Sequence, residues 1–233
     1  MNRKVVGVAS AVVALVLTGF GTLGPASGAG KVEPITRTCE GFTELETHDG
    51  FQHPEPTCVE TEFGEVSEQS KNPQLLIVDA PEKVRANEPF TIDVSTRNLV
   101  RDRFLKAADG GYYLESGTLN EQGLTRGHFH TACRQITDEN NAPTPDRNNI
   151  FIATEDGGGG ASPDTVSVKI ANGLPAVGTF QCAAWAGDGS HRVPLMSFAN
   201  QIPAFDTVRI EVKGAMAKGQ DKRSKEDKDK SGD

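Results

Sequence analysis

The chain has 233 residues and a formal net charge of -8. A net negative charge disfavours binding to the phosphate backbone of nucleic acids, so we expect no nucleic-acid partner. The 25 glycines and 13 prolines predict many turns, which favours short strands over long helices.

The N-terminus has the three-part pattern of a secretory signal peptide. A short basic start over residues 1–4 is followed by an apolar run over residues 5–17 and then by small residues up to Gly30. We therefore predict a signal peptide over residues 1–29 and a secreted, extracellular protein. The apolar run is shorter than the roughly 20 residues needed to span a bilayer, so we expect no membrane span in the mature protein.

Four cysteines in an exported chain are most simply two disulfides, and sequence alone permits three pairings. We expect the nearest-neighbour pairing, Cys39 with Cys58 and Cys133 with Cys182. A metal–thiolate cluster is the alternative, although no Cys-x-x-Cys spacing supports it. Residues 30–72 are polar and acidic, so this N-terminal segment is expected to depend on the Cys39–Cys58 bridge for its shape.

Residues 73–213 carry the strand patterns and are predicted to form one β-sandwich domain. Short apolar or alternating runs predict strands at 75–78, 90–97, 112–116, 149–154, 164–170 and 206–212. One of the two adjacent tyrosines in 112–116 should lie on each face of its strand. Apolar residues recur at spacings of three and four over residues 99–108, which predicts a short helix. Residues 214–233 are charged and almost free of apolar side chains, which predicts a disordered tail.

Two segments hold two of the cysteines, three of the five histidines and the only tryptophan. These segments are residues 127–133 and 180–191. Alternation along a strand places Phe129 and Cys133 on one face, and His128 and His130 on the other. If Cys133 bonds Cys182, the cysteine face is buried, and the two histidines are then exposed or line a groove.

The sharpest functional hypothesis is a metal site built from His128, His130 and His191, completed by Asp188 or a water. Histidines two residues apart in a strand project side by side, and neutral imidazoles suit copper or zinc. The alternative is that the two strand histidines are partly exposed surface residues and that His191 satisfies the turn in which it lies.

Other patterns carry weaker signals. Glu155 and Asp156, together with the glycine run at 157–160 and Asp164, could bind calcium, but they lack the acidic spacing of a known calcium loop. No Gly-x-Ser-x-Gly elbow is present, so nothing indicates a nucleophilic hydrolase. Trp185 is expected to pack against the sandwich or, if exposed, to offer a platform for a sugar ligand.

Residues 73–97 contain an apolar strand, an Asn-Glu-Pro turn at 87–89 and an alternating second strand. This order resembles the opening of bacterial immunoglobulin-like or fibronectin-like modules. The resemblance implies an all-β, antiparallel, immunoglobulin-like sandwich of about eight strands that is cross-linked by disulfides. The Gly-His-Phe-His-Thr-Ala-Cys-Arg stretch at 127–134 and the Trp-Ala-Gly-Asp-Gly-Ser-His-Arg-Val-Pro stretch at 185–194 are similar to those of an uncharacterised secreted actinobacterial-type protein family. That resemblance implies no catalytic residues.

The sequence therefore predicts a secreted, non-enzymatic binding or envelope-associated module. Its partner would be an extracellular protein or glycan, recognised through the edge near Trp185 and the histidines, with no firmly implied cofactor. The alternative function is a copper- or zinc-binding protein, either a carrier or a redox enzyme, that uses His128, His130 and His191.

Overall fold

The structure is a computed structural model that describes residues 39–40, 43–145 and 150–214. The predicted signal peptide at 1–29 lies outside the described residues, as does all of the predicted tail after Gly214. In the part of the chain that is described, no helix is both long enough and apolar enough to cross a membrane.

The described residues form ten strands and two single-turn 3-10 helices, which are written η. In chain order these are η1 (Gln69–Lys71), β1 (Gln74–Asp79), β2 (Lys83–Arg85), β3 (Phe90–Arg97), β4 (Leu99–Val100), η2 (Ala107–Asp109), β5 (Thr125–Ile136), β6 (Ile150–Thr154), β7 (Gly159–Gly160), β8 (Asp164–Ile170), β9 (Gly178–Asp188) and β10 (Phe205–Lys213).

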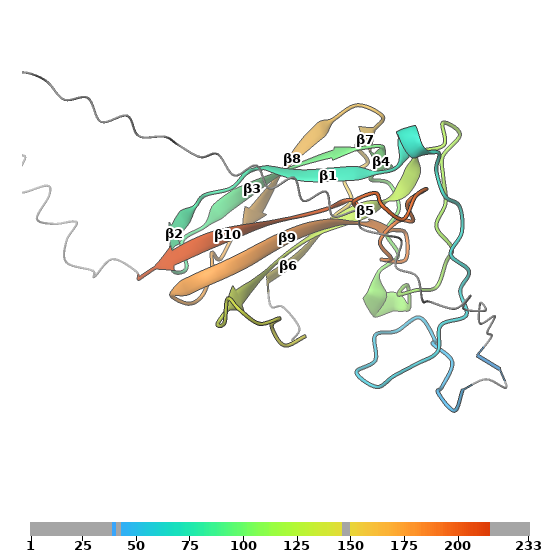
Figure 1. The fold of residues 1–233 in the computed structure, drawn as a ribbon, viewed down its shortest axis with the longest axis horizontal. Helices are drawn as coiled ribbons and strands as arrows, with labels where there is room; N and C mark the ends of the chain where they lie inside the picture. The colour runs from blue at the N-terminus through green and yellow to red at the C-terminus, as the bar shows by residue number, and fades with distance from the viewer. Residues whose placement is uncertain (1–38, 41–42, 146–149, 215–233) are drawn as a thin grey trace, which may run out of the picture. The chain divides into compact units, whose positions relative to one another are not determined.

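The strands make two sheets in separate layers, which confirms the prediction of an all-β fold (Figure 1). One is the three-stranded antiparallel sheet β1-β3-β8. The other has seven strands in the order β2-β10-β9-β5-β4-β7, with β6 also paired to β5. The pairs β2–β10 and β4–β5 are parallel, so the larger sheet is mixed. An immunoglobulin sandwich has two antiparallel sheets, and the immunoglobulin-like assignment therefore stays a prediction.

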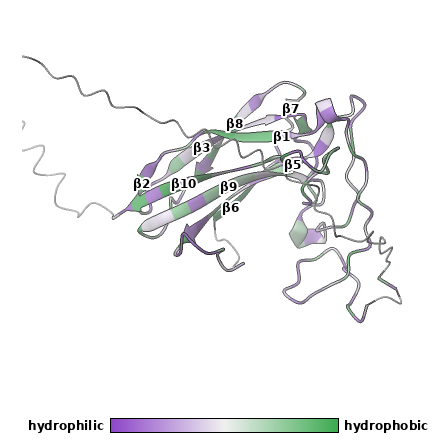
Figure 2. Ribbon diagram, in the orientation of Figure 1, coloured by the Kyte–Doolittle hydropathy of each residue, from purple (hydrophilic) through white to green (hydrophobic). Residues whose placement is uncertain are grey.

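The hydrophobic core lies between the two sheets. Ile92 and Val94 of β3 are fully buried and share the core with Phe129 of β5 and Ile210 of β10. Burial alternates along β3, as the apolar–polar pattern of its sequence predicts. Figure 2 shows the hydrophobic character along β1, which belongs to the same core. Removal of these side chains from water is the main force that holds the layers together.

Both disulfides follow the nearest-neighbour pairing. Cys133 and Cys182 lie directly opposite each other on the neighbouring strands β5 and β9, with their Cα atoms 4.1 Å apart. Cys39 and Cys58 close a loop in the N-terminal segment, with a Cα–Cα distance of 5.7 Å. Apart from η1, residues 43–72 form no helix and only isolated bridges, so the Cys39–Cys58 bond is a main constraint on this segment.

The helix predicted over residues 99–108 is wrong. Its first residues form β4, residues 101–106 run without regular structure, and only the single turn η2 is helical. The apolar side chains at helical spacing go to separate places, since Leu99 enters the core whereas Phe104 packs against His128. Tertiary contacts, rather than one amphipathic face, therefore set the path of this segment.

The strand predicted at 112–116 is also wrong. Tyr113 has a φ of 54°, in the left-handed region, so the backbone turns here instead of extending. The rings of Tyr112 and Tyr113 stack with centroids 4.0 Å apart and do not lie on opposite faces. This turn places both tyrosines beside the segment that contains His191.

Arg101 links the two sheets from a fully buried position. Its guanidinium donates to Asp156 at 2.8 Å, to Asp164 of β8 at 2.5 Å and to the Thr96 hydroxyl of β3 at 2.7 Å. Hydrogen bonds from Arg101 lower the pKa of both aspartates. Two of the three carboxylates that were considered for calcium, those of Asp156 and Asp164, are therefore partners of an arginine.

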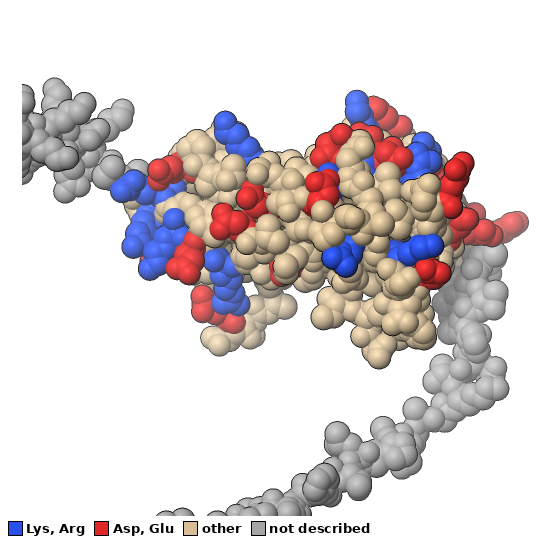
Figure 3. Space-filling model, turned by 90° about the horizontal axis from the view of Figure 1, so that it is seen from above, with Lys and Arg blue, Asp and Glu red and all other residues tan. Residues whose placement is uncertain are grey.

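Charged side chains are spread over the face of the molecule seen in Figure 3. Acidic and basic residues are interspersed on this face, and opposite charges form exposed pairs such as Lys83 with Glu211 at 2.9 Å. Exposed pairs of this kind contribute little to stability, because water and salt screen the two charges. This face therefore shows no extended field of one sign that would steer a highly charged polymer toward it.

Candidate metal centre

Strand β5 and the turn after β9 bring three histidines together. His128 and His130 project from the face of β5 opposite to Phe129, and in register they face Gly187 and Trp185 of β9. His191 follows β9 in a tight turn and has a φ of 74°. A Cβ atom on Gly187 would lie 3.0 Å from His128 Nε2, so glycine leaves room there for the imidazole.

The ligand atoms of the three histidines converge. His128 Nε2 lies 2.8 Å from His130 Nε2, and His191 Nδ1 lies 3.3 Å from the same atom. The three nitrogens all lie within 4.8 Å of one another. Metal–nitrogen bonds of 2.0–2.1 Å in a tetrahedral site require nitrogen–nitrogen distances of roughly 3.3 Å. The cluster therefore needs only small side-chain movements to bind one ion.

Backbone carbonyls fix the tautomers of two of these rings. His128 Nδ1 is 3.1 Å from the carbonyl oxygen of Arg103, and His191 Nε2 is 2.6 Å from that of Leu105. A carbonyl oxygen can only accept, so each of these nitrogens carries a hydrogen when its ring is neutral. The opposite nitrogens, His128 Nε2 and His191 Nδ1, then direct lone pairs at His130 Nε2.

His130 cannot satisfy both lone pairs. A hydrogen on its Nε2 can be donated well to only one of the two neighbours, and its Nδ1 is buried without a hydrogen-bond partner among the described residues. A metal cation at the point of convergence would instead accept one lone pair from each ring. Carbonyls that orient metal-binding imidazoles through the second ring nitrogen are usual around protein metal sites.

Burial keeps the three rings neutral, which is the form that binds metals. Desolvation lowers the pKa of His128 to about 4, although the Arg103 carbonyl opposes this shift. Desolvation, together with the neighbouring imidazoles, lowers the pKa of His130 to about 3. The pKa of His191 is also lowered by burial, against the raising effects of the Leu105 carbonyl and Asp188.

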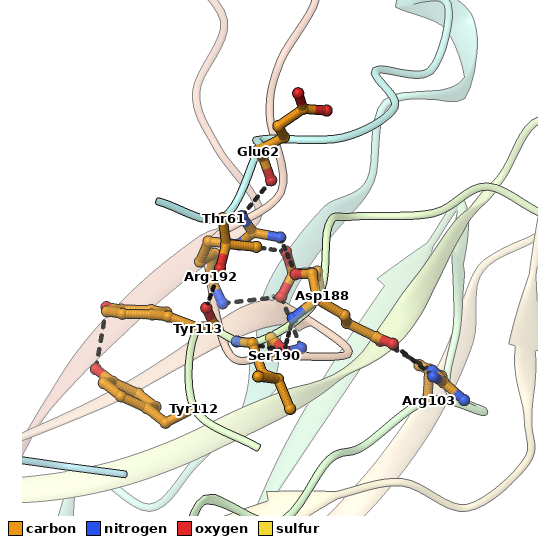
Figure 4. A network of polar contacts seen from close by, with 10 residues as sticks. Thr61, Glu62, Arg103, Tyr112, Tyr113, Asp188, Ser190 and Arg192 are labelled. Carbon is orange, nitrogen blue, oxygen red and sulfur yellow. Dashed lines mark hydrogen bonds and ion pairs between the residues drawn. The ribbon is translucent and has the colours of Figure 1, made fainter. Parts of the chain in front are cut away.

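The turn that holds His191 is fixed by polar contacts (Figure 4). The Asp188 carboxylate accepts hydrogen bonds from the backbone N–H groups of Ser190 and Arg192 at 2.9 and 3.0 Å, and from Arg192 Nε at 2.9 Å. The Ser190 hydroxyl oxygen accepts from the backbone N–H groups of Leu114 and Glu115. These contacts hold His191 in its left-handed conformation, which costs energy for a residue other than glycine.

The same network ties the N-terminal segment to the turn. Arg192 donates to the Glu62 carbonyl at 2.8 Å and to the Glu115 carbonyl, and the Thr61 hydroxyl donates to the Tyr113 carbonyl at 2.6 Å. Arg103, whose carbonyl contacts His128, forms an ion pair with Glu115. The backbone around the histidines is thus held from several sides.

The fold and the histidine geometry can now be set beside known proteins. A family model described as the CLU5d N-terminal domain matches residues 76–213, which is more than half of the chain. The chain belongs to the CLU5d N-terminal domain family. The matched range of the CLU5d N-terminal domain includes all three clustered histidines and the Cys133–Cys182 bond, but not the Cys39–Cys58 loop. A comparison with curated proteins found no match.

In this CLU5d N-terminal domain the structure corrects two assignments of single residues. His128 and His130 are 0% and 3% exposed, so they are not surface residues. Asp188 does not join the converging nitrogens, because its carboxylate binds Arg192 and the turn. Burial raises the pKa of Asp188, while Arg192 and the turn N–H groups oppose that shift.

Aromatic rings surround the histidines of the CLU5d N-terminal domain. Trp185 is half-buried with its ring centroid 5.1 Å from that of His130, and Phe151 lies 4.9 Å from His130. Phe104 packs edge-on against His128 and His191, with centroids 4.8 and 5.2 Å away. The roles of Phe104 and Phe151 were not foreseen, because neither residue lies in a recognisable motif.

The lowered pKa values predict acid sensitivity in the metal-free CLU5d N-terminal domain. Unfolded histidines titrate near pH 6.5, whereas folded His128 and His130 stay neutral down to about pH 4 and 3. The unfolded chain therefore binds more protons between these values, so this contribution to stability is complete above pH 6.5 and is lost as the pH falls.

We expect each ring to cost up to about 1.4 kcal/mol per pH unit below pH 6.5. Urea unfolding in EDTA between pH 7.5 and 4.5 measures the effect. A His130→Phe variant should lose less stability with acid than the wild type. Equal pH profiles for the two proteins would contradict the prediction.

The Asp188 network makes a second prediction for the CLU5d N-terminal domain. Asp188→Asn keeps the size of the side chain but removes its charge and directs an amide N–H₂ toward existing donors, so the His191 turn should loosen. Loss of such a supporting contact typically weakens metal binding about 10- to 100-fold. Zinc titration by calorimetry would show this, with Asp206→Asn on β10 as a control that should leave zinc affinity unchanged. Zinc affinity equal to that of the wild type would rule out a positioning role for Asp188.

Proposed function

We propose that this protein is an exported metal-binding protein that holds one copper or zinc ion through His128, His130 and His191. The observation that supports it most strongly is the pair of lone pairs, fixed by the Arg103 and Leu105 carbonyls, that converge on His130 Nε2. A site with three imidazoles and no thiolate suits zinc and copper. Three protein ligands also leave a coordination position for an exogenous group, as in catalytic or carrier sites.

The exported location is supported by the two disulfides. Stable disulfides form mainly in oxidising compartments outside the cytosol, and the chain holds two of them, Cys39–Cys58 and Cys133–Cys182. The signal-peptide pattern at 1–29 points the same way. Both the secretion and the likeness to secreted actinobacterial-type proteins remain part of the proposal.

A second candidate function is an extracellular binding module for a protein or glycan. An exposed apolar side chain next to Trp185 favours it, because Phe205 lies opposite Trp185 in the β9–β10 register and is 46% exposed. Ile202, which precedes β10 in the chain, is 74% exposed. Exposed apolar groups of this kind occur at interaction surfaces. If the wild type binds to cell-envelope material in a pull-down, an Ile202→Ser/Phe205→Ser variant should no longer bind. Equal binding of the variant and the wild type would exclude this edge as the binding surface.

Metal content tests the proposed function directly. The mature protein, exported and purified without chelator, then dialysed against excess zinc or copper sulfate and freed of loose ions, should retain one equivalent of metal. A His128→Ala/His130→Ala variant should retain none, because a single remaining imidazole binds weakly. A His48→Ala/His53→Ala variant removes two histidines outside the cluster and should retain the full equivalent.

Circular dichroism of all three proteins checks that they are folded. The proposal fails if the folded wild type takes up neither metal, or if the His128→Ala/His130→Ala variant holds as much metal as the wild type.

A further inference from the structure

We propose that a planar aromatic anion binds beside the three histidines and completes the coordination of the metal with an oxygen atom. This inference rests on the proposed metal-binding function and adds the chemical class of the ligand. An aromatic carboxylate or a phenolate belongs to this class.

The coordination position that the histidines leave open faces a cavity. His130 and His191 line a cavity of about 530 Å³. His128 lies behind them and is fully buried. Among the described residues, the cavity side is thus the side from which a ligand can reach the histidines. The volume lies within the range of typical small-molecule sites, about 300–1,000 Å³.

The walls of this cavity are flat aromatic rings. Phe104, Tyr112, Phe151 and Trp185 all line it. Contacts among these rings and with the imidazoles fix the orientation of the rings. The ring centroids of Phe151 and Trp185, for example, lie 6.4 Å apart. Aromatic pairs prefer offset-stacked or edge-to-face arrangements. The rings therefore favour a flat aromatic ligand over a non-planar one of equal size.

The charges at the cavity favour an anion. Three neutral imidazoles leave the full positive charge of a divalent ion uncompensated at the base of the cavity. None of the described residues that line the cavity is acidic, and the one charged side chain among them is Lys106. An anionic oxygen could thus bind the metal at one end of the cavity while Lys106 adds attraction at the mouth.

Benzoate is the test ligand, titrated into zinc-loaded protein and followed by the fluorescence of Trp185, the only tryptophan in the chain. Benzamide has the same ring without charge, and cyclohexanecarboxylate has the same charge without the flat ring. We expect benzoate to bind at least about tenfold more tightly than either control, which corresponds to about 1.4 kcal/mol. Lys106→Ala should weaken benzoate binding several-fold, whereas Lys169→Ala, an exposed lysine on β8, should not.

Cobalt-loaded protein reports whether the ligand reaches the metal. Direct binding of benzoate to cobalt should change the visible absorption spectrum in step with the fluorescence titration. The inference is overturned if zinc binds but benzoate does not, if benzamide binds equally well, or if the cobalt spectrum stays unchanged while Trp185 responds. In those cases the proposed metal-binding function stands. Failure to bind zinc or cobalt at all would instead reject the function and the inference together.

Discussion

Saturation with zinc should raise the free energy of unfolding by about 4 kcal/mol at a free zinc concentration about 1,000 times the dissociation constant. The proposed metal would bind the folded chain, in which the nitrogens of His128, His130 and His191 lie within 4.8 Å of one another. Residues 131–190, which include all of β6 to β9, separate His191 from the other two histidines along the chain, so the three come together only on folding. The stabilisation follows because a ligand specific to the native state shifts the equilibrium toward it.

The gain should disappear when one central ligand is removed. His130→Ala leaves two imidazoles, so zinc should no longer shift the urea midpoint, while His53→Ala on the exposed N-terminal segment should keep the whole shift. Unfolding curves with zinc and with EDTA measure both effects. A zinc-dependent shift of the same size in the His130→Ala protein would place the metal elsewhere.

Removal of both carboxylate partners of Arg101 should destabilise the protein by at most about 3–5 kcal/mol, the cost of breaking a fully buried ion pair. Asp156→Ala/Asp164→Ala leaves a guanidinium that is 1% exposed without a carboxylate. Burial of an unpaired charge costs far more than an exposed ion pair contributes, because water cannot solvate it. The two aspartates are 38% and 46% exposed, so the penalty arises mainly at the arginine.

A further substitution separates charge burial from simple loss of contacts. Changing Arg101 to Met in the double variant removes the buried charge and should recover much of the lost stability. Glu211→Ala, which breaks an exposed pair with Lys83, should leave the free energy of unfolding almost unchanged. Urea unfolding of the four proteins at pH 7 gives the comparison. If the triple variant were no more stable than the double variant, the buried charge would not be the cause.

Much of the fold could be predicted because its strands follow simple alternation. Residues 90–97 and 164–170 form β3 and β8 as expected, since their apolar side chains face one core and their polar ones face solvent. The parallel strand β2 escaped prediction because three residues carry no period. The segment 99–108 was misassigned because its helical spacing reflects contacts with separate parts of the fold.

The misassigned segment is also the reason why the two carbonyl groups that orient His128 and His191 were not foreseen. In a helix over residues 99–108, the Arg103 carbonyl would accept a hydrogen bond from the N–H group four residues later, and the Leu105 carbonyl would point along the helix axis from the last turn. In the irregular path that the structure shows, these carbonyls face His128 and His191 instead. The sequence alone could therefore name the histidines but not the groups that fix their tautomers.

The order of residues by itself determined the all-β class and the shared face of His128 and His130, because both follow from period-two alternation. It favoured the pairing of neighbouring cysteines, which the structure then selected from three possible pairings. Only the tertiary structure decided that His191 joins them, that Asp188 holds a turn and binds Arg192, and that Phe104, Phe151 and Trp185 surround the cluster. These contacts join residues far apart in the chain, and their energies depend on burial and on the path of irregular segments, which no local pattern encodes.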